Sequence, residues 1–332
     1  MSEFNLIENY FKRPAARAAS AGTLGIGDDC ALLTPRPGTQ LAISSDMLVE
    51  GRHFFAGADA TRLGHKALAV NLSDLAACGA TPLAFTLALA LPSADADWLA
   101  GFSKGLLALA DAAGCEMVGG DTTRGPLTIC ITVFGEIPLF EGQSRALLRS
   151  GAQVGDDVYV SGTLGDARLA LEALRGNIAV PATVFEAARA RLEQPTPRVA
   201  LGQALRGVAS SAIDLSDGLV GDLQHVLTAS SVGATINTAV AINMIAVCAH
   251  PDWSSALIDS ETQLEWVLAG GDDYELAFTA PAAAQGAVQA ASKRAATPVT
   301  RIGRIEAAPG IRLVDGKGRM VPHRFASFDH FA

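Results

Sequence analysis

The chain has 332 residues, of which 49% are apolar and 18% are charged, and its 25 basic and 34 acidic side chains give a formal charge of −9. This composition is typical of a folded globular protein and excludes disorder over most of the chain. The length exceeds the roughly 250–300 residues at which one core usually stops growing, so we expect two domains. An acidic chain without a Lys/Arg block is not expected to bind nucleic acid.

No segment is expected to cross a membrane. The longest apolar runs, residues 83–91 and 238–249, fall short of the roughly 18–20 residues that span a bilayer. Residues 1–20 contain acidic side chains and lack the apolar stretch of a signal peptide. We therefore expect the protein to stay in the cytoplasm.

The first part of the chain alternates between strand and helix patterns, which is typical of an α/β domain. The expected strands are 41–45, ending at Asp46, and then 83–91, 115–118 and 127–137. The expected helices are 61–78, which stops at Gly79, and 95–113, which stops at Gly114.

Between residues 138 and 157 the periodicity lapses into a polar passage that contains glycine, and we place the domain boundary there. We expect residues 1–140 to form one domain and residues 149–332 to form a second α/β domain. In the second domain the expected strands are 158–161, 212–215, 274–279, 299–305 and 311–314, and the expected helices are 166–175, 182–192, 198–208, 217–230 and 282–295.

Carboxylates recur at the expected ends of these elements, beside Gly or Ser. A single Ser-Asp is most often a helix N-cap, and a single Gly-Asp-Asp is most often a turn. Six such groups together indicate a site for hard divalent cations, because Mg²⁺ takes one or two carboxylates together with substrate phosphates. The groups are Gly27-Asp28-Asp29, Ser44-Ser45-Asp46, Ser73-Asp74, Gly119-Gly120-Asp121, Asp214-Leu215-Ser216-Asp217 and Gly271-Asp272-Asp273.

The spacing of Asp214 and Asp217 lets both carboxylates face one cavity if a helix begins between them, with the Ser216 hydroxyl offered to a phosphate. Other nucleotide and hydrolase signatures are absent: the sequence has no P-loop, no protein-kinase motifs, no G-x-S-x-G and no H-E-x-x-H. Cys30 stands where a dinucleotide loop that begins at Gly25 needs its third glycine.

An ordered set of motifs resembles the thiamine-monophosphate kinase family. The set is Gly25-Ile-Gly-Asp-Asp-Cys-Ala31, Ser44-Ser-Asp46, His53-Phe54, residues 66–76, Gly119-Gly-Asp-Thr-Thr-Arg124, residues 149–152, Ile213-Asp-Leu-Ser-Asp-Gly218 and residues 270–276. The resemblance implies the two-domain fold of aminoimidazole-ribonucleotide synthetase, with an amino-terminal domain whose strands pair with a second subunit and a carboxy-terminal α/β domain. It also implies ATP, thiamine monophosphate and several Mg²⁺ ions.

The resemblance carries site residues over by position. Those that match metal ligands are Asp29, Ser44, Ser45, Asp46, Asp74, Asp121, Asp214 and Asp217. Those that match nucleotide contacts are Gly120, Asp121, Arg149 and Ser216, and those that match thiamine contacts are His53, Asp272 and Phe325. Asp272 and Phe325 depart from the commoner Glu and Trp or Tyr of the family, so the substrate pocket is the less secure part of the comparison.

The resemblance implies the last step of thiamine diphosphate synthesis. The acceptor is a phosphate oxygen that is already ionised, so direct in-line transfer from ATP needs no general base and no catalytic nucleophile. Asp46, Asp121 and Arg149 are expected to act electrostatically. We also expect a homodimer, because the strands 83–91 and 127–137 are apolar enough to need cover on both faces.

Three alternatives stay open. One is another ATP-using enzyme of the same superfamily, such as aminoimidazole-ribonucleotide synthetase or a selenide-activating kinase. A selenide-activating kinase is expected to have a reactive Cys or its equivalent near a Gly-rich amino terminus, and this chain has no cysteine before Cys30. A second is a metal-dependent phosphohydrolase that uses the same carboxylates to activate water. A third is an acidic metal-binding or scaffold protein without catalysis.

Overall fold

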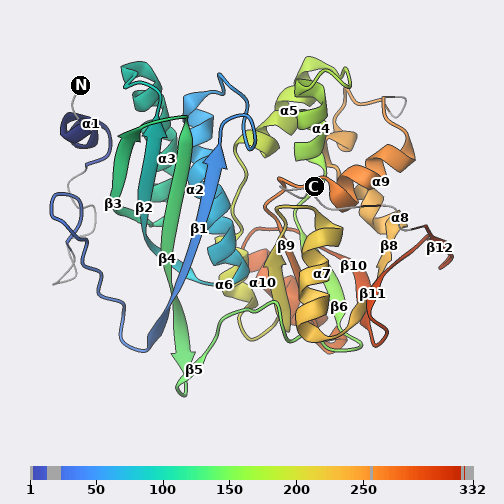
Figure 1. The fold of residues 1–332 in the computed structure, drawn as a ribbon. Coiled ribbons are helices and arrows are strands. Elements are labelled where there is room, and N and C mark those ends of the chain that lie inside the picture. Colours follow the sequence, from blue (N-terminus) through green and yellow to red (C-terminus); the bar gives the residue numbers. More distant parts are fainter. Residues whose placement is uncertain (1–2, 13–23, 255–256, 323–324, 326–332) are drawn as a thin grey trace. The chain divides into compact units, whose positions relative to one another are not determined.

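The computed structural model describes residues 3–12, 24–254, 257–322 and 325. The chain divides into two compact units (Figure 1). Met1–Leu75 and Ala80–Arg145 form the first unit, and Ala76–Gly79 and Ala146–Ala332 form the second. No helix in the described segments is long and apolar enough to cross a membrane.

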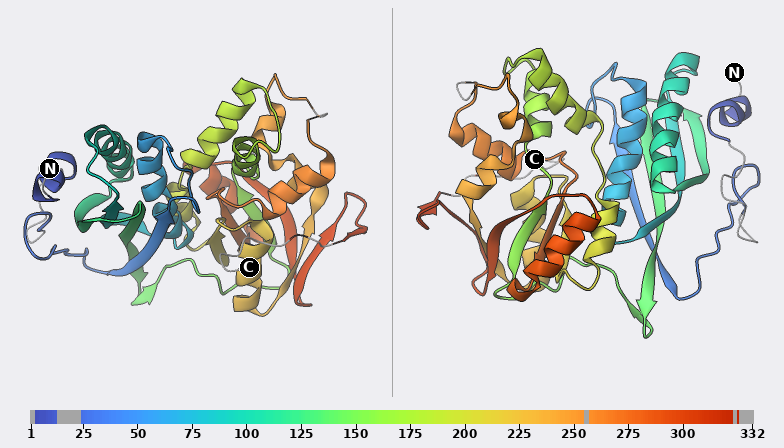
Figure 2. Two further views of the ribbon diagram at one scale, coloured as in Figure 1. Left: turned by 45° about the horizontal axis from the view of Figure 1, so that its top comes forward. Right: turned by 180° about the vertical axis from the view of Figure 1, so that it is seen from behind.

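The first unit is a sheet whose strands run in the order β1, β4, β2, β3, with the short β5 paired to β4. Helices α2 and α3 lie against one face of this sheet (Figure 2). The elements are α1 (Glu3–Tyr10), β1 (Thr39–Val49), α2 (Ala60–Ala77), β2 (Thr81–Leu91), α3 (Ala96–Ala113), β3 (Glu116–Arg124), β4 (Thr128–Phe140) and β5 (Gln143–Ser144).

Local signals account for the sharp limits of α3. The Asp95 side chain accepts the backbone N–H groups of Asp97 and Trp98, both at 3.0 Å, and Gly114 ends the helix at φ 61°. A carboxylate N-cap satisfies amides that have no partner inside the helix, and glycine adopts the left-handed conformation at the end without a side-chain clash.

Only one face of the first sheet is well covered. In β4, Ile129, Ile131 and Val133 are buried, whereas the alternate residues between them are partly exposed. On β1, Ile43 and Met47 are 62% and 54% exposed. We expected these strands to need cover on both faces. Within the unit, the helices cover one face, and the other face stays partly exposed.

The second unit is a mixed seven-stranded sheet in the order β12, β11, β8, β10, β6, β9, β7, in which only β8 and β11 pair in parallel. Its elements are β6 (Asp157–Ser161), α4 (Asp166–Leu174), α5 (Ala182–Glu193), α6 (Val199–Leu205), β7 (Ser211–Asp214), α7 (Leu219–Ser230), β8 (Gly233–Asn237), α8 (Thr238–Ala241), α9 (Ser260–Ala269), β9 (Leu276–Ala280), α10 (Gln285–Arg294), β10 (Val299–Glu306), β11 (Gly310–Val314), β12 (Met320–Val321) and the 3-10 turns Ile242–Met244, Ala246–Ala249 and Ala282–Ala284.

The central strands of this second sheet are buried on both faces, because a hydrophobic core lies on each side. Val158, Val160 and Ala277 belong to one core, which packs against α4, α7 and α9. Tyr159 and Phe278 belong to the other, where their rings stack 5.2 Å apart beside α6 and α10. Continuous burial explains why residues 158–160 of β6 and 276–278 of β9 are consecutive apolar residues without polar alternation.

Several expected limits are corrected. The strand expected to end at Asp46 continues to Val49, and the strand expected to stop at residue 118 continues to Arg124, so Asp46 and Asp121 lie within strands and not at their ends. The helix expected from Asp217 begins at Leu219. The sequence reading missed β8 and α9, since neither segment has a strong period.

Candidate active site

In the first unit, β1 and α2 bring together oxygen groups that are far apart in the sequence. The Ser44 hydroxyl donates a hydrogen bond to Asp74 Oδ2. The backbone N–H of Asp46 donates to Asn71 Oδ1 at 3.1 Å, and the Asn71 amide donates in turn to Ala67 O at 2.9 Å. Three expected metal ligands, Ser44 and Asp46 of β1 and Asp74 of α2, therefore lie where β1 faces α2.

Asn71 is a site residue that the sequence reading missed. It is buried one helical turn before Asp74, and its side chain fixes the backbone beside Asp46. The signal was present in the motif Asn71-Leu-Ser-Asp74, in which the two ends lie three residues apart and so share one helix face.

Ser45 lies on the other side of β1. Its hydroxyl is 3.0 Å from Thr132 Oγ1 and 3.6 Å from Cys130 Sγ, both on β4. Because successive side chains of a strand point to opposite faces, Ser45 points away from the cluster that Ser44 and Asp46 form with α2. The side chains of the Ser44-Ser45-Asp46 motif thus lie on two opposite faces of the sheet.

Asp121 and Gly120 lie on β3, at the far edge of the same sheet. Gly120 pairs with Leu87 in register, and Asp121 pairs with Ala88. Gly120 has φ 151°, and a Cβ added there would lie 1.9 Å from Leu87 O, so this position requires glycine. With β4 and β2 between the two edge strands, three spacings of about 4.8 Å separate β3 from β1 by roughly 14 Å.

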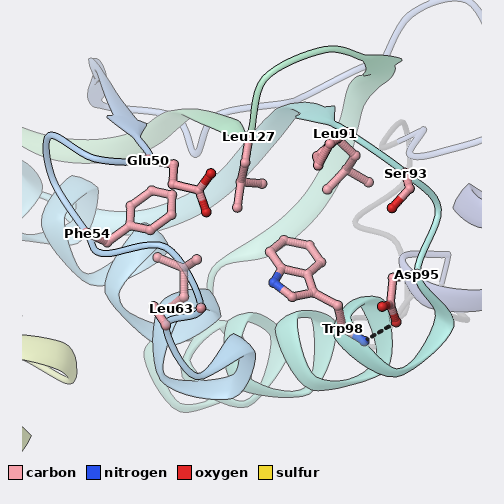
Figure 3. Close-up of a pocket in the computed structure, with 11 residues that line it drawn as sticks. Glu50, Phe54, Leu63, Leu91, Ser93, Asp95, Trp98 and Leu127 are labelled. Carbon is pink, nitrogen blue, oxygen red and sulfur yellow. Dashed lines mark hydrogen bonds between the residues drawn. The ribbon is translucent and has the colours of Figure 1, made fainter.

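His53 is partly buried in the turn after β1, where its Nδ1 accepts the backbone N–H of Val49 at 3.0 Å. The same turn borders a cavity of about 220 Å³ (Figure 3). The rings of Phe54 and Trp98 and the Glu50 carboxylate line this cavity, and Asp95 at its rim is engaged in capping α3. None of the expected site residues lines it, so this cavity is separate from the oxygen cluster.

Asp29 is exposed, and its backbone N–H donates to Asp28 Oδ1 at 2.9 Å in the loop that the Leu24–Leu32 pairing closes. This hydrogen bond is local. It orders the Gly27-Asp28-Asp29 segment, and a turn is the ordinary interpretation of such a motif.

In the second unit, Asp214 is the last residue of β7 and is 7% exposed. A turn follows, and α7 begins only after Gly218. Asp222, in the first turn of α7, accepts the backbone N–H groups of Ser216 and Asp217 on Oδ2, both at 3.0 Å. Burial raises the pKa of Asp222 to about 7, and the neighbouring Asp217 charge adds to this shift while the amide donors oppose it.

The segment that carries Asp272 lies directly against the same turn. The Asp272 N–H donates to Ser216 O and the Tyr274 N–H donates to Leu215 O, both at 2.8 Å. Asp272 and Tyr274 have φ 59° and 50°, the left-handed conformation that non-glycine residues seldom adopt. The fold therefore places Ser216, Asp217 and Asp272 side by side, although about 55 residues separate them in the sequence.

A buried ion cluster anchors that segment. Glu275 is fully buried, and its Oε1 lies 2.7 Å from Arg191 and 2.5 Å from Arg198. The Ser161 hydroxyl donates to Glu275 Oε2 at 2.6 Å, and the Glu275 carbonyl accepts the Leu215 N–H at 2.9 Å. Glu275 therefore connects the core of the unit to the turn that follows Asp214.

Arg149 and Phe325 are the remaining expected site residues of this unit. The Arg149 carbonyl accepts a hydrogen bond from Ser230 Oγ at 3.3 Å, and its side chain is exposed. The preceding Leu148 carbonyl accepts the Ala212 N–H at 2.9 Å, which places this segment beside β7. Phe325 is partly buried against the core of the unit.

The described segments contain no group of three or more His, Cys, Asp or Glu side chains arranged to hold a metal ion. The acids occur instead in small sets, Asp46 with Asp74 in one unit and Asp214 with Asp217 in the other. Each set offers hard oxygen ligands, and neither is a complete coordination shell. Such incomplete sets suit Mg²⁺, which usually keeps waters and takes its other ligands from phosphates.

The chain matches the family of AIR synthase related proteins, which defines the class of its fold: residues 27–137 match the N-terminal domain and residues 153–316 the C-terminal domain. A thiamine-monophosphate kinase of Salmonella typhimurium is 44% identical over 332 residues, covering 99% of this chain and 98% of that protein. The chain therefore belongs to the AIR synthase related family and, within it, to the thiamine-monophosphate kinases.

Two solved structures are similar over most of their length. The thiamine-monophosphate kinase of Stenotrophomonas maltophilia has a TM-score of 0.84 at 41% identity, covering 97% of this chain and 98% of that one. AaThiL complexed with AMPPCP and TMP has a TM-score of 0.72 at 29% identity, covering 90% and 89%. The two-domain α/β fold expected from the sequence is confirmed.

Proposed function

We propose that this protein transfers the γ-phosphoryl group of ATP to thiamine monophosphate, giving thiamine diphosphate and ADP in the cytoplasm. The observation that carries the proposal is the 44% identity to thiamine-monophosphate kinases over 99% of the chain. The AaThiL structure holds both AMPPCP and TMP, which supports ATP and thiamine monophosphate as the two substrates.

Mg²⁺ is the metal that the donor set fits. The candidate ligands are carboxylates and hydroxyls: Asp29, Ser44, Ser45, Asp46, Asp74, Asp121, Asp214 and Asp217. The Ser44–Asp74 hydrogen bond already orients an Asp74 carboxylate oxygen next to β1. When bound, the ions neutralise the phosphates that must approach each other. Gly120, Arg149 and Ser216 are proposed to contact the nucleotide, and His53, Asp272 and Phe325 the thiamine moiety.

Direct in-line transfer follows from the chemistry of the acceptor. A phosphate monoester oxygen is ionised at neutral pH, so the chain need not supply a base. Asp46 and Asp121 are proposed as metal ligands, and a carboxylate whose lone pairs are engaged in this way is a poor nucleophile. The exposed Arg149 guanidinium is free to give a bidentate cation to a phosphate, which stabilises charge in the transition state.

We further propose a homodimer in which the first sheets of two copies close on each other and share the site. Within one copy, Asp121 lies roughly 14 Å from the strand of Asp46, whereas two oxygen ligands of one Mg²⁺ lie about 3–4 Å apart. A second copy that sets its β3 edge beside β1 removes this separation. It also covers Leu41, Ile43 and Met47, which are 40%, 62% and 54% exposed, and it leaves no free strand edge.

The kinase proposal is tested by the products. The purified protein is incubated with ATP, Mg²⁺ and a panel of phosphomonoesters, and the products are identified by mass. Thiamine diphosphate together with ADP supports the proposal. Another doubly phosphorylated product would indicate the activity of a different member of the superfamily. Free phosphate without thiamine diphosphate would indicate a phosphohydrolase, and no nucleotide turnover would indicate a scaffold. Light scattering tests the homodimer independently.

A further inference from the structure

We propose that Asp222 is a positioning residue, which holds the Ser216–Asp217 turn in the conformation that binds nucleotide and metal. Asp222 has no expected contact with either ligand, and the inference rests on the proposed function of its two neighbours.

Asp222 closes one side of the turn. Its own N–H donates to Gly218 O at 3.0 Å, which starts α7, and its side chain folds back beyond the start of the helix. A single oxygen, Oδ2, takes the N–H groups of both Ser216 and Asp217. Because these two amides are fixed by one atom, the Ser216 hydroxyl and the Asp217 carboxylate keep a constant relative orientation.

The other sides of the turn are closed by backbone. The Ser216 carbonyl accepts the Asp272 N–H at 2.8 Å. A Cβ added to Gly271 would lie 2.8 Å from the same carbonyl, and a Cβ added to Gly218 would lie 2.8 Å from Ala269 Cα at the end of α9. With these approaches so close, the turn has little room to move while Asp222 is in place.

Burial of the Asp222 carboxylate is unfavourable by itself. Asp222 is 4% exposed, and burying a carboxylate is unfavourable unless hydrogen bonds compensate. The compensating donors are the amides of the turn itself. Removing the carboxylate leaves two amides without this acceptor, and such groups move toward water or other partners. The turn then relaxes before any ligand arrives.

The test compares two variants of the full chain, Asp222→Ala and Asp222→Asn. The asparagine side chain keeps one carbonyl oxygen that can accept a hydrogen bond. Three quantities are measured: hydrogen exchange at the Ser216 and Asp217 amides in the free protein, calorimetric binding of Mg²⁺ with AMPPCP, and the KM values for both substrates. We expect faster exchange in Asp222→Ala and a roughly tenfold loss of AMPPCP affinity, because both amides of the turn lose their acceptor. The KM for ATP rises in parallel, and Asp222→Asn recovers most of the affinity.

Asp166 provides a matched control. It is also buried, at 1% exposed, and also accepts two backbone N–H groups, those of Ala246 and Val247, at 3.0 Å each. Asp166→Ala removes a buried carboxylate and both of its amide contacts without disturbing the 216–217 turn, so its AMPPCP affinity remains that of the wild type. If Asp222→Ala does not fold, Asp222→Glu, which displaces the carboxylate by one methylene, is measured in its place with the same expected loss.

The positioning role is overturned if Asp222→Ala binds AMPPCP with wild-type affinity. If the alanine variant does not fold, wild-type affinity of Asp222→Glu overturns it. An equal loss in Asp166→Ala overturns it too, because any buried carboxylate would then matter as much. If AMPPCP binding depends on Asp222 but no thiamine diphosphate is formed, the kinase proposal is contradicted and the positioning role is supported. A wild-type protein that does not bind AMPPCP contradicts both.

Discussion

Asp46 and Asp121 lie on the two opposite edge strands of one sheet, with β4 and β2 between them. Both residues are proposed metal ligands, and both lie within their strands, where the backbone holds them in place. A single copy of the sheet therefore separates two groups that the proposed chemistry needs together. The separation is the main reason for proposing a site that two copies share.

Mixing two inactive variants is expected to restore activity. Asp46→Asn and Asp121→Asn should each lose most of the kinase activity and stay folded, because each lacks a metal ligand in both sites of its dimer. After unfolding and refolding together, half of the dimers are mixed and carry one intact site, so the mixture regains about a quarter of wild-type activity. A steady-state assay before and after mixing measures this.

The control mixture combines Asp46→Asn with Asp74→Asn. These two residues belong to the same β1–α2 cluster, on one side of the sheet. Every site in the mixed dimer then lacks one of them, and no activity returns. Equal recovery in both mixtures, or full activity of a monomer, would contradict the shared site without affecting the kinase proposal.

Direct transfer predicts inversion at phosphorus. With ATP made chiral at the γ-phosphorus and thiamine monophosphate as acceptor, one displacement inverts the configuration and two restore it. We expect inversion, because the proposed site offers metal-bound carboxylates and no prepared nucleophile. Stereochemical analysis of the thiamine diphosphate formed decides it. Retention, or a phosphoprotein trapped from ATP alone, would contradict direct transfer.

Replacing Glu275 is expected to cost much of the stability of the second unit. Glu275→Ala leaves Arg191 and Arg198 largely buried beside a lost carboxylate, and breaking a buried ion pair from one side costs about 3–5 kcal/mol in the free energy of unfolding. The control is Glu306→Ala, whose 42%-exposed carboxylate pairs with Arg312, with an expected cost below about 1 kcal/mol. Urea unfolding measures both, and equal losses would refute the assignment.

The buried Asp166 predicts a pH dependence of stability with a definite sign. Burial raises the pKa of Asp166 despite the hydrogen bonds from Val247 and Ala246. From the ordinary aspartate pKa of about 3.9 up to the raised native pKa, the folded state binds more protons than the unfolded state, so stability falls as pH rises. Asp166→Asn removes this fall, and its stability relative to wild type improves with rising pH.

Urea unfolding of the metal-free protein across this pH range provides the measurement. Asp315→Asn is the control with the opposite sign, since hydrogen bonds from Arg319 lower the pKa of Asp315. The contribution of Asp315 is present above the ordinary pKa and is lost as pH falls, so the stability of its variant relative to wild type improves with falling pH. A pH-independent difference for Asp166→Asn would contradict the buried-charge interpretation.

Many elements could be predicted from the sequence because their signals are local. The helix α3 begins and ends where Asp95 and Gly114 predict, since a cap acts on the nearest amides and carbonyls. The same holds for the apolar strand β2 and for the motif residues themselves, whose order and spacing indicate the family. Neighbours a few residues apart determine these features, so no long-range contact is needed to read them.

The arrangement of the candidate site was decided by the tertiary structure. Strand pairing, and not spacing along the chain, determines that Ser44 meets Asp74 while Asp121 lies on the opposite edge. The turn at Ser216 likewise gets its shape from Asp222 and from the segment between α9 and β9. These contacts depend on register between distant segments, and register follows from the burial of whole sheet faces, which no single motif encodes.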